Sequence, residues 1–253
     1  MEVQLIRNAT LRIRYAGQMI LIDPDLAPKH HRPSFTGHSA NPMVDLPFPP
    51  GEVAAGVDLL LVSHLHQDHF DAVEVLPRDL PILCQPGDEA AIREKGFGAV
   101  TPLDGSADWR GVRISRTGGQ HGTGEVGQWM GNVSGFVLEA PGEPTLYWAG
   151  DTIWCEPVRE ALGRFRPDVV ITHSCGARWL DATGVRQLIV MDAEQTLAVC
   201  AAAPHATVVA THMEALDHAT VSRADLRAAA EAQDLPAARL RIPDDGSVVS
   251  FER

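Results

Sequence analysis

The sequence has few of the residues on which several classes of protein depend. Its 253 residues include only four cysteines, and no two of these form a CxxC pair, so a disulfide framework is not expected. It contains no apolar run long enough to cross a membrane, and its first residues, MEVQLIR, lack the basic and apolar regions of a signal peptide. These absences predict a soluble, cytoplasmic protein.

Positive charge is also scarce. Asp and Glu number 33 against 21 Lys and Arg, which gives a formal net charge of −12. A surface that binds nucleic acid or an anionic membrane is normally basic. We therefore expect a small-molecule substrate as the partner of this protein, with no nucleic acid and no membrane. The sequence leaves open whether the chain forms a homo-oligomer.

Short apolar and β-branched runs alternate with helical patterns along the chain. Strands are expected at residues 3–7, 10–15, 19–22, 57–62, 79–84, 112–117, 136–140, 145–149, 169–172, 207–210 and 248–251. Helices are expected at residues 71–76, 87–95, 156–165, 192–203 and 222–233. This pattern indicates an α/β protein with mixed sheets, and we expect residues 1–253 to form a single domain.

Three stretches between these elements are expected to be loops. Residues 24–56 contain seven prolines and three histidines, and so long a loop inside a compact domain is usually functional. We expect it to form a lid or rim beside the functional site, with its histidines exposed to solvent. Residues 118–135 are rich in glycine, and no dinucleotide-binding motif that follows a strand and opens a helix is expected there. Residues 176–186 form the third loop.

The most informative stretch is SHLHQDH at residues 63–69, directly after a buried apolar run. Side chains alternate sides in an extended segment, so one short loop can serve two neighbouring metal ions. His64 and His66 would bind one ion, and Asp68 and His69 would bind the other. Imidazole and carboxylate ligands without cysteine suit zinc, manganese, iron or nickel.

The HLHQDH motif resembles the signature of the metallo-β-lactamase-fold hydrolases. Three further motifs, GGQHG, WAGDT and ATHME, follow in the order that this family has, and they supply His121, Asp151 and His212. The resemblance spans most of the chain and extends to the branch that includes ascorbate-6-phosphate lactonase and related uncharacterised hydrolases. It implies a four-layer αββα sandwich, in which two mixed β-sheets are flanked by helices.

The resemblance also implies two divalent metal ions, with zinc as the first expectation and manganese or iron as alternatives. The ligands of the first ion would be His64, His66 and His121. The ligands of the second ion would be Asp68, His69 and His212, and Asp151 would bridge the two ions. Metal coordination lowers the pKa of bound water to about 7, so a metal-bound hydroxide would be available at neutral pH.

The expected function is that of a metal-dependent hydrolase, which uses this hydroxide to cleave an ester, lactone or phosphoester bond in a small polar metabolite. Asp68 would orient the hydroxide or take its proton. His218, six residues after His212, would donate a proton to the leaving group.

Other polar residues near the motifs are expected to support the site. Ser63 and Asp71 would hydrogen-bond ligand imidazoles and fix their tautomers. His173, at the end of a strand, would contact the substrate or a ligand, or would simply be hydrogen-bonded at the strand tip. Asp192 is expected to cap a helix.

Two other classes of protein stay open at this point. One is an iron-dependent redox enzyme on the same fold, which bound iron and oxygen uptake would support. The other is a non-catalytic metal-binding protein. Both classes resemble this chain less well, because proteins of these kinds more often lack part of the ligand set, and all seven ligand positions are filled here.

Overall fold

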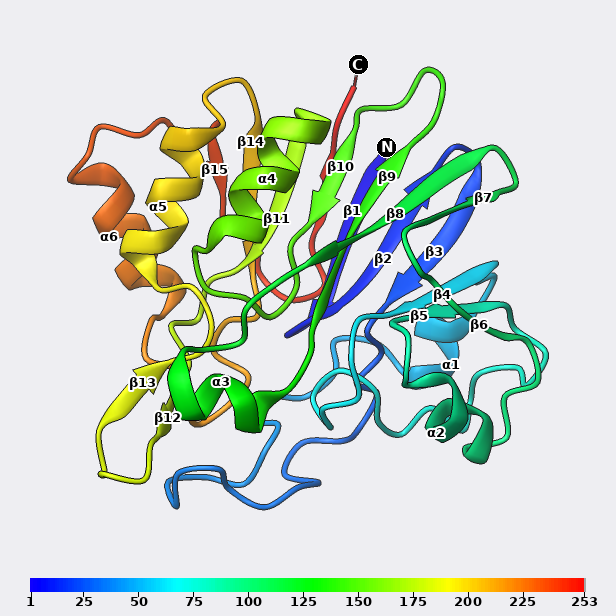
Figure 1. Ribbon diagram of the computed structural model, residues 1–253, viewed down its shortest axis with the longest axis horizontal. Coiled ribbons are helices and arrows are strands. Elements are labelled where there is room, and N and C mark those ends of the chain that lie inside the picture. Colours follow the sequence, from blue (N-terminus) through cyan, green and yellow to red (C-terminus); the bar gives the residue numbers. More distant parts are fainter. Residues whose placement is uncertain (253) are drawn as a thin grey trace.

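Two seven-stranded β-sheets pack face to face at the centre of the molecule (Figure 1). The computed structural model describes residues 1–252. In spatial order the first sheet consists of β16 (Val248–Ser250), β1 (Glu2–Arg7), β2 (Thr10–Tyr15), β3 (Gln18–Ile22), β4 (Leu59–Val62), β5 (Ile82–Cys84) and β6 (Val100–Pro102). The second consists of β15 (Leu240–Arg241), β14 (Thr207–Thr211), β11 (Val169–His173), β10 (Leu146–Trp148), β9 (Ser134–Glu139), β8 (Val112–Gly118) and β7 (Ser106–Trp109).

Both sheets are mixed. In the first, β16 to β3 are antiparallel and β3 to β6 are parallel. In the second, β7 to β10 are antiparallel and β10, β11, β14 and β15 are parallel. The parallel strands determine where a functional site can form, because the loops that follow their carboxyl ends lie together at one edge of each sheet.

Helices cover the outer face of each sheet (Figure 1). The helices are α1 (Pro50–Ala54), α2 (Glu89–Glu94), α3 (Gly124–Met130), α4 (Glu156–Phe165), α5 (Ala193–Ala202) and α6 (Arg223–Glu231). Apolar residues of α4, α5 and α6 share one cluster with the second sheet, and those of α1 and α2 share another with the first. The predicted αββα sandwich is therefore confirmed.

The central strands are apolar on both faces because both faces are covered. In β4, Leu59 and Leu61 belong to the cluster between the sheets, whereas Leu60 packs in the cluster beneath the helices. In β11, Ile171 and Val170 divide in the same way between the two sides of the second sheet. This arrangement explains why these strands appear in the sequence as continuous apolar runs.

Local signals set the starts of two outer helices, and the predicted cap at Asp192 is confirmed. Asp192 caps α5 by accepting a hydrogen bond from the backbone N–H of Gln195 at 3.1 Å. Ser222 and Asp225 form a reciprocal capping box at the start of α6. Each cap supplies an acceptor for an N–H group that has no partner within its own helix.

Several local predictions were wrong. Residues 71–76 form turns rather than a helix, and residues 176–186 contain most of a hairpin, β12 (Arg178–Leu180) and β13 (Arg186–Leu188), rather than a loop. In the glycine-rich stretch, residues 122–127 have the GxGxxG spacing and do open α3. The strands on either side, β8 and β9, are antiparallel, so this is not the βαβ unit that a dinucleotide site requires.

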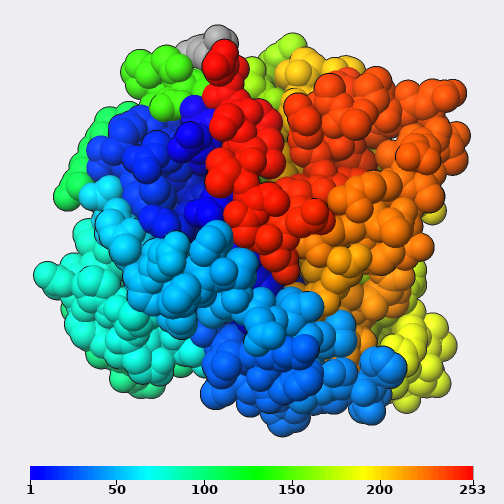
Figure 2. Space-filling view, turned by 180° about the vertical axis from the view of Figure 1, so that it is seen from behind, coloured from blue at the N-terminus to red at the C-terminus, as the bar shows by residue number. Residues whose placement is uncertain are grey.

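Residues 24–56 form a long surface segment that contains α1 and a short antiparallel bridge between Arg32 and Asn41. Its blue portion lies beside the yellow β12–β13 hairpin at the lower edge of the molecule (Figure 2). Across residues 1–252, none of the helices combines the length and apolar character that a membrane span needs.

Candidate metal centre

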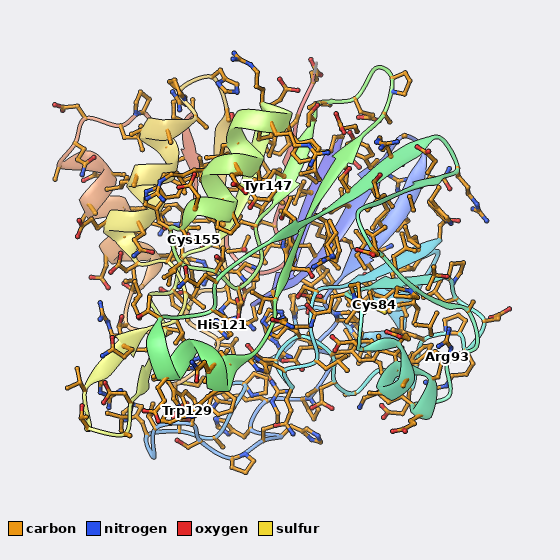
Figure 3. The ribbon with its side chains drawn as sticks, viewed as in Figure 1. Cys84, Arg93, His121, Trp129, Tyr147 and Cys155 are labelled. Atoms are coloured by element: carbon orange, nitrogen blue, oxygen red, sulfur yellow. The ribbon has the colours of Figure 1, made fainter. Side chains whose placement is uncertain are left out.

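The predicted ligands lie on four loops, each of which leaves the carboxyl end of a strand. The loop after β4 carries His64, His66, Asp68 and His69. The remaining three, His121, Asp151 and His212, follow β8, β10 and β14. Figure 3 shows His121 between the end of β8 and α3, in the region where the two sheets meet. The structure thus brings all seven residues to one edge of the sandwich.

Three histidines form the first ligand group: His64, His66 and His121. Their nearest nitrogens all lie within 4.8 Å of one another. The Nδ1 atoms of two rings already have partners, since His64 Nδ1 lies 2.9 Å from Ser63 Oγ and His121 Nδ1 donates to the carbonyl of Ile189 at 2.8 Å. His64 Nε2 is buried without a hydrogen-bond partner. A buried imidazole nitrogen without a partner that faces two other rings is suited to bind a cation.

The second group contains Asp68, His69, Asp151 and His212. His69 Nε2 lies 3.1 Å from Asp151 Oδ2 and 3.5 Å from Asp68 Oδ2. His212 Nε2 lies 3.2 Å from Asp68 Oδ2 and 3.6 Å from Asp151 Oδ1. Ligand atoms about 2.1 Å from a tetrahedral zinc ion lie about 3.4 Å from one another. The separations therefore fit a shared ion.

Asp151 lies between the two groups. Its Oδ2 atom is 3.6 Å from His121 Nε2 in the first group and 3.1 Å from His69 Nε2 in the second. This position is the one that a bridging carboxylate needs. The role of each residue as a ligand stays a prediction, and the geometry is consistent with all seven.

Asp23, at the end of β3, is a residue of the site that sequence reasoning missed. Its carboxylate is completely buried and lies 2.7 Å from His69 Nδ1. It also accepts hydrogen bonds from the N–H of Ser63 at 2.8 Å and from its hydroxyl at 2.5 Å. Asp23 therefore orients a ligand imidazole. Its place after a strand that runs parallel to β4 is the signal that could have revealed it.

The two predicted supporting residues have different outcomes. Ser63 does contact a ligand imidazole, that of His64. The prediction for Asp71 was wrong, because its carboxylate accepts a hydrogen bond from Arg32 at 3.0 Å instead. Arg32 in turn donates to the carbonyl of Gln67 at 3.0 Å. This guanidinium therefore connects the Asp71 carboxylate to residues 63–69, here called the metal loop.

His173 supports Asp151 rather than facing the substrate. Its Nδ1 atom lies 2.5 Å from Asp151 Oδ1, which is a hydrogen-bond distance and too short for two ligands of one ion. The ring is fully buried and packs edge-on against Trp148 with centroids 5.1 Å apart. This single contact fits two of the predicted roles, contact with a predicted ligand and a hydrogen bond at the strand tip.

The electrostatics of the site keep Asp68 and Asp151 ionised and divide the imidazoles into two kinds. Burial lowers the pKa of His64 and lowers the pKa of His121 to about 4. Burial alone would raise the pKa of Asp151, but the imidazoles of His69 and His212 hold this pKa well below its usual range. Burial also acts to lower the pKa values of His69 and His212, but the Asp151 carboxylate raises both well above their usual range. Metal ligands bind in the deprotonated form, so a cation would displace protons from these two rings, whereas His64 and His121 are already neutral.

A cavity of about 320 Å³ opens above both ligand groups. Its polar floor includes Asp68, Asp151 and His218. Its walls are apolar and consist of Phe35, Leu65, Met130, Trp179 and Ile189. The predicted proton donor His218 thus shares the cavity with the ligands, and its Nδ1 atom is buried without a partner. His30, His31 and His38 of the long segment are exposed and do not line the cavity.

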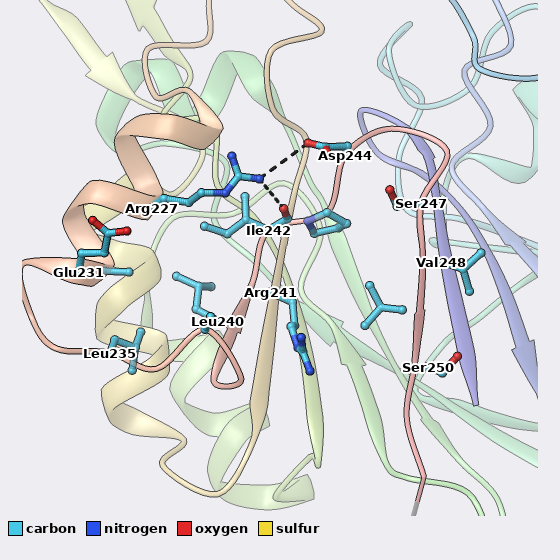
Figure 4. A pocket seen from close by; sticks show the side chains of 14 residues that line it. Arg227, Glu231, Leu235, Leu240, Arg241, Ile242, Asp244, Ser247, Val248 and Ser250 are labelled. Carbon is cyan, nitrogen blue, oxygen red and sulfur yellow. Dashed lines mark hydrogen bonds and ion pairs between the residues drawn. The ribbon is translucent and has the colours of Figure 1, made fainter.

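Not every hollow has this chemistry. One of about 630 Å³ lies between α6 and the edge strands β15 and β16 (Figure 4). There Arg227 donates to the carbonyl of Ile242 at 3.0 Å and pairs with Asp244 at 3.7 Å, and none of the predicted ligands lines the hollow. The smaller cavity above the ligands is therefore the functional candidate.

Gly150 allows the chain to turn directly before Asp151. Its φ angle is +71°, and a Cβ atom there would lie 2.6 Å from the carbonyl oxygen of Ser134. Left-handed backbone and overpacking each cost about 1–3 kcal/mol, so Gly150→Ala is expected to destabilise the fold by about 3 kcal/mol and to lower metal content. Gly163→Ala in α4 is the matched control, since nothing lies within 4 Å of its Cβ position. Urea denaturation should show it unchanged or slightly stabilised.

The sequence of the chain is similar to those of known proteins. Residues 18–213 match the family model described as a beta-lactamase superfamily domain. The chain is 34% identical to the UPF0173 protein YddR of Bacillus subtilis, over 99% of this chain and 100% of that protein. It is 31% identical to a UPF0173 metal-dependent hydrolase of Xanthobacter autotrophicus, over 60% of this chain and 62% of that protein.

Solved structures are also similar over the full length. A possible metal-dependent hydrolase from Veillonella parvula has a TM-score of 0.94 and 33% identity, with 99% of each chain covered. The isothiocyanate hydrolase from Delia radicum gut bacteria has a TM-score of 0.92 and 36% identity, with 100% of each chain covered. The chain therefore belongs to the beta-lactamase superfamily and, within it, to the metal-dependent hydrolases.

Proposed function

We propose that this protein hydrolyses small, uncharged electrophiles at a dinuclear metal centre, with isothiocyanates as the first candidate substrates. The observation that carries the proposal is the composition of the cavity above the ligand groups. Five apolar side chains form its walls, and among residues 1–252 no lysine or arginine lines it. Such a cavity favours an apolar, neutral molecule over an anionic one.

The similarity to isothiocyanate hydrolase supports this choice of substrate. That protein is 36% identical over the whole of both chains. An isothiocyanate, R–N=C=S, is neutral and places an electrophilic carbon next to an apolar arm R. The polar floor and apolar walls of the cavity provide matching surroundings for these two parts.

The reaction requires an activated water molecule and two proton movements. Metal ions held by the two ligand groups would supply a water nucleophile at neutral pH. Asp68 lines the cavity, and we assign it the proton that the attacking water loses. Attack at carbon shifts the N=C electron pair to nitrogen, which takes a proton. The resulting thiocarbamic acid, RNH–C(=O)–SH, divides into RNH₂ and COS, so one water is consumed for each isothiocyanate.

His218 is positioned to supply the proton to nitrogen. It lines the cavity with Asp68, and burial lowers the pKa of its imidazole. A neutral imidazole carries one N–H and one lone pair, so it can release a proton and recover one. We therefore retain the role of proton donor for His218 in this proposal.

Esters and lactones, which the sequence predicted, are the second candidates, because they too present a neutral electrophilic carbon. Phosphoesters fit the cavity less well, since phosphate recognition normally relies on arginine or lysine. Arg116 lines a neighbouring hollow beyond His121, and there its guanidinium donates to the hydroxyl of Ser134 at 3.3 Å.

The test compares benzyl isothiocyanate, benzyl acetate, a γ-lactone and benzyl phosphate as substrates of the zinc- or manganese-loaded protein. We expect the isothiocyanate to be consumed fastest, with one benzylamine formed for each molecule lost. Protein treated with a chelator should be inactive and should recover when metal is returned. Fastest turnover of benzyl phosphate, or equal turnover without metal, would refute the proposal. Oxygen uptake by an iron-loaded sample would support the redox enzyme instead.

A further inference from the structure

The segment from Ser34 to Ser39, here called the strap, crosses one side of the cavity and contributes Phe35 to its wall. Phe35 packs edge-on against His218, with ring centroids 5.0 Å apart, and is tilted at 60° to Trp179, with centroids 6.0 Å apart. Trp179 is also edge-on to His218 at 6.2 Å. Three rings from distant parts of the chain thus form one corner of the cavity.

The strap is held in place by a single carboxylate, that of Asp217. Its Oδ1 atom accepts hydrogen bonds from the N–H of Phe35 at 3.1 Å and from the amide of Asn41 at 2.9 Å. Its Oδ2 atom accepts from the N–H and the hydroxyl of Thr36, at 3.2 Å and 2.7 Å, and also from the hydroxyl of Ser34. The backbone of Phe35 is therefore fixed by the residue that precedes His218.

Phe35 and Trp179 are only partly buried, so both rings keep faces or edges available to a ligand. Aromatic rings prefer offset or edge-to-face neighbours at centroid distances of about 4.5–7 Å. The two rings are tilted against each other and line the cavity together with Asp68 and Asp151. They suit a third ring or branched apolar group whose reactive end points towards the ligand groups.

We infer that Phe35 and Trp179 bind the apolar arm of the substrate and make this enzyme selective for arylalkyl substrates, with Asp217 as the positioning residue for Phe35. The inference rests on the proposed function in that the substrate is taken to be neutral. Beyond that function, the inference specifies the chemical class of the substrate's apolar arm and the residues that select it. Asp217, which holds the strap, directly precedes His218, the proposed proton donor. The position of the strap is therefore linked to that of His218.

The test measures kcat/KM for benzyl and methyl isothiocyanate, and for benzyl and methyl acetate. We expect Phe35→Ala to lower the ratio of benzyl to methyl by about tenfold, mainly through the KM for the benzyl substrates. Phe35→Leu keeps an apolar side chain and should lower the ratio less. Trp129→Ala is the matched control, because this tryptophan is 50% exposed on α3 and does not line the cavity.

Asp217→Asn should lower the same ratio about threefold or more, because an amide replaces one acceptor oxygen with a donor that faces other donors. The control is Asp58→Asn. Asp58 accepts a hydrogen bond from the N–H of Met19 at 2.9 Å, at the opposite end of β4 from the metal loop. An unchanged ratio in Phe35→Ala would overturn the aromatic site. An unchanged ratio in Asp217→Asn alone would overturn the positioning role.

Failure of the proposed function can be told apart from failure of this inference. If neither isothiocyanates nor acetates are hydrolysed, ligand-observed NMR with benzyl alcohol still reports on the cavity. We expect saturation transfer to the benzyl ring in the wild type and in Trp129→Ala, and a clear loss in Phe35→Ala. Equal transfer in all three proteins would overturn the aromatic site whatever the enzyme hydrolyses.

Discussion

Asp151→Asn is expected to abolish hydrolysis and to reduce bound metal, because Asp151 is the carboxylate that lies between both ligand groups. Its Oδ2 atom is within 3.6 Å of a histidine from each group. A neutral amide has the same shape but would contribute no negative charge to the metal ions proposed for the two ligand groups. Losing about 4 kcal/mol of charge stabilisation corresponds to about a thousandfold in rate. Metal analysis and kcat/KM with benzyl isothiocyanate measure both effects.

The control for Asp151→Asn is Asp168→Asn. Asp168 precedes β11 and accepts a hydrogen bond from the N–H of Thr145 at 2.8 Å, so it lies at the end of the sheet that is remote from the ligands. We expect full metal content and nearly full activity. His173→Gln should fall between the two variants, at about tenfold to a hundredfold below wild type, as supporting residues of metal sites usually do. Wild-type metal content and activity in Asp151→Asn would rule out the bridging role.

The sequence predicted the parts of the site that are encoded locally. The histidines and aspartates of residues 63–69 stand in one short loop after a buried strand, so their proximity follows from the spacing alone. His121, Asp151 and His212 each follow an apolar run in the same way, and the resemblance to a family supplied their order. The layers of the fold followed from the same runs, since a strand buried on both faces must have a neighbour on each side.

The parts that were missed depend on contacts between distant residues. Asp23 contacts His69 across 46 positions, and Asp217 contacts the strap across about 180. No local pattern marks Phe35 as a wall of the cavity, because its position is set by a carboxylate on another loop. The predicted helix at residues 71–76 failed for a similar reason. Asp71 bonds to Arg32 and forms a bridge with Asp25, and these distant contacts outweigh weak local helix propensity.

Asp25 is the centre of a buried ionic cluster, and its removal is expected to have the largest effect on stability. Its side chain is completely buried and forms a two-point pair with Arg32, at 2.9 Å and 2.6 Å. The guanidinium of Arg7, also buried, lies 3.4 Å from the same carboxylate. Burial lowers the pKa of Arg7; burial also acts to lower that of Arg32, but the adjacent Asp25 carboxylate raises it overall. Without the carboxylate, the buried Arg7 would lose the acidic side chain that it contacts, and Arg32 would keep only its pair with Asp71.

Asp25→Ala is therefore expected to lower the free energy of unfolding by about 3–5 kcal/mol, seen in urea as a lower midpoint with an unchanged slope. Arg32 also holds the carbonyl of Gln67, so the metal loop should loosen and metal content should fall in parallel. The matched control is Glu2→Ala, which removes the exposed pair with Arg14 at 3.2 Å and should cost at most about 1 kcal/mol. Equal losses of unfolding free energy in the two variants would mean that Asp25 stabilises the protein no more than a surface charge does. The proposed link between this ionic cluster and the metal loop would then be wrong.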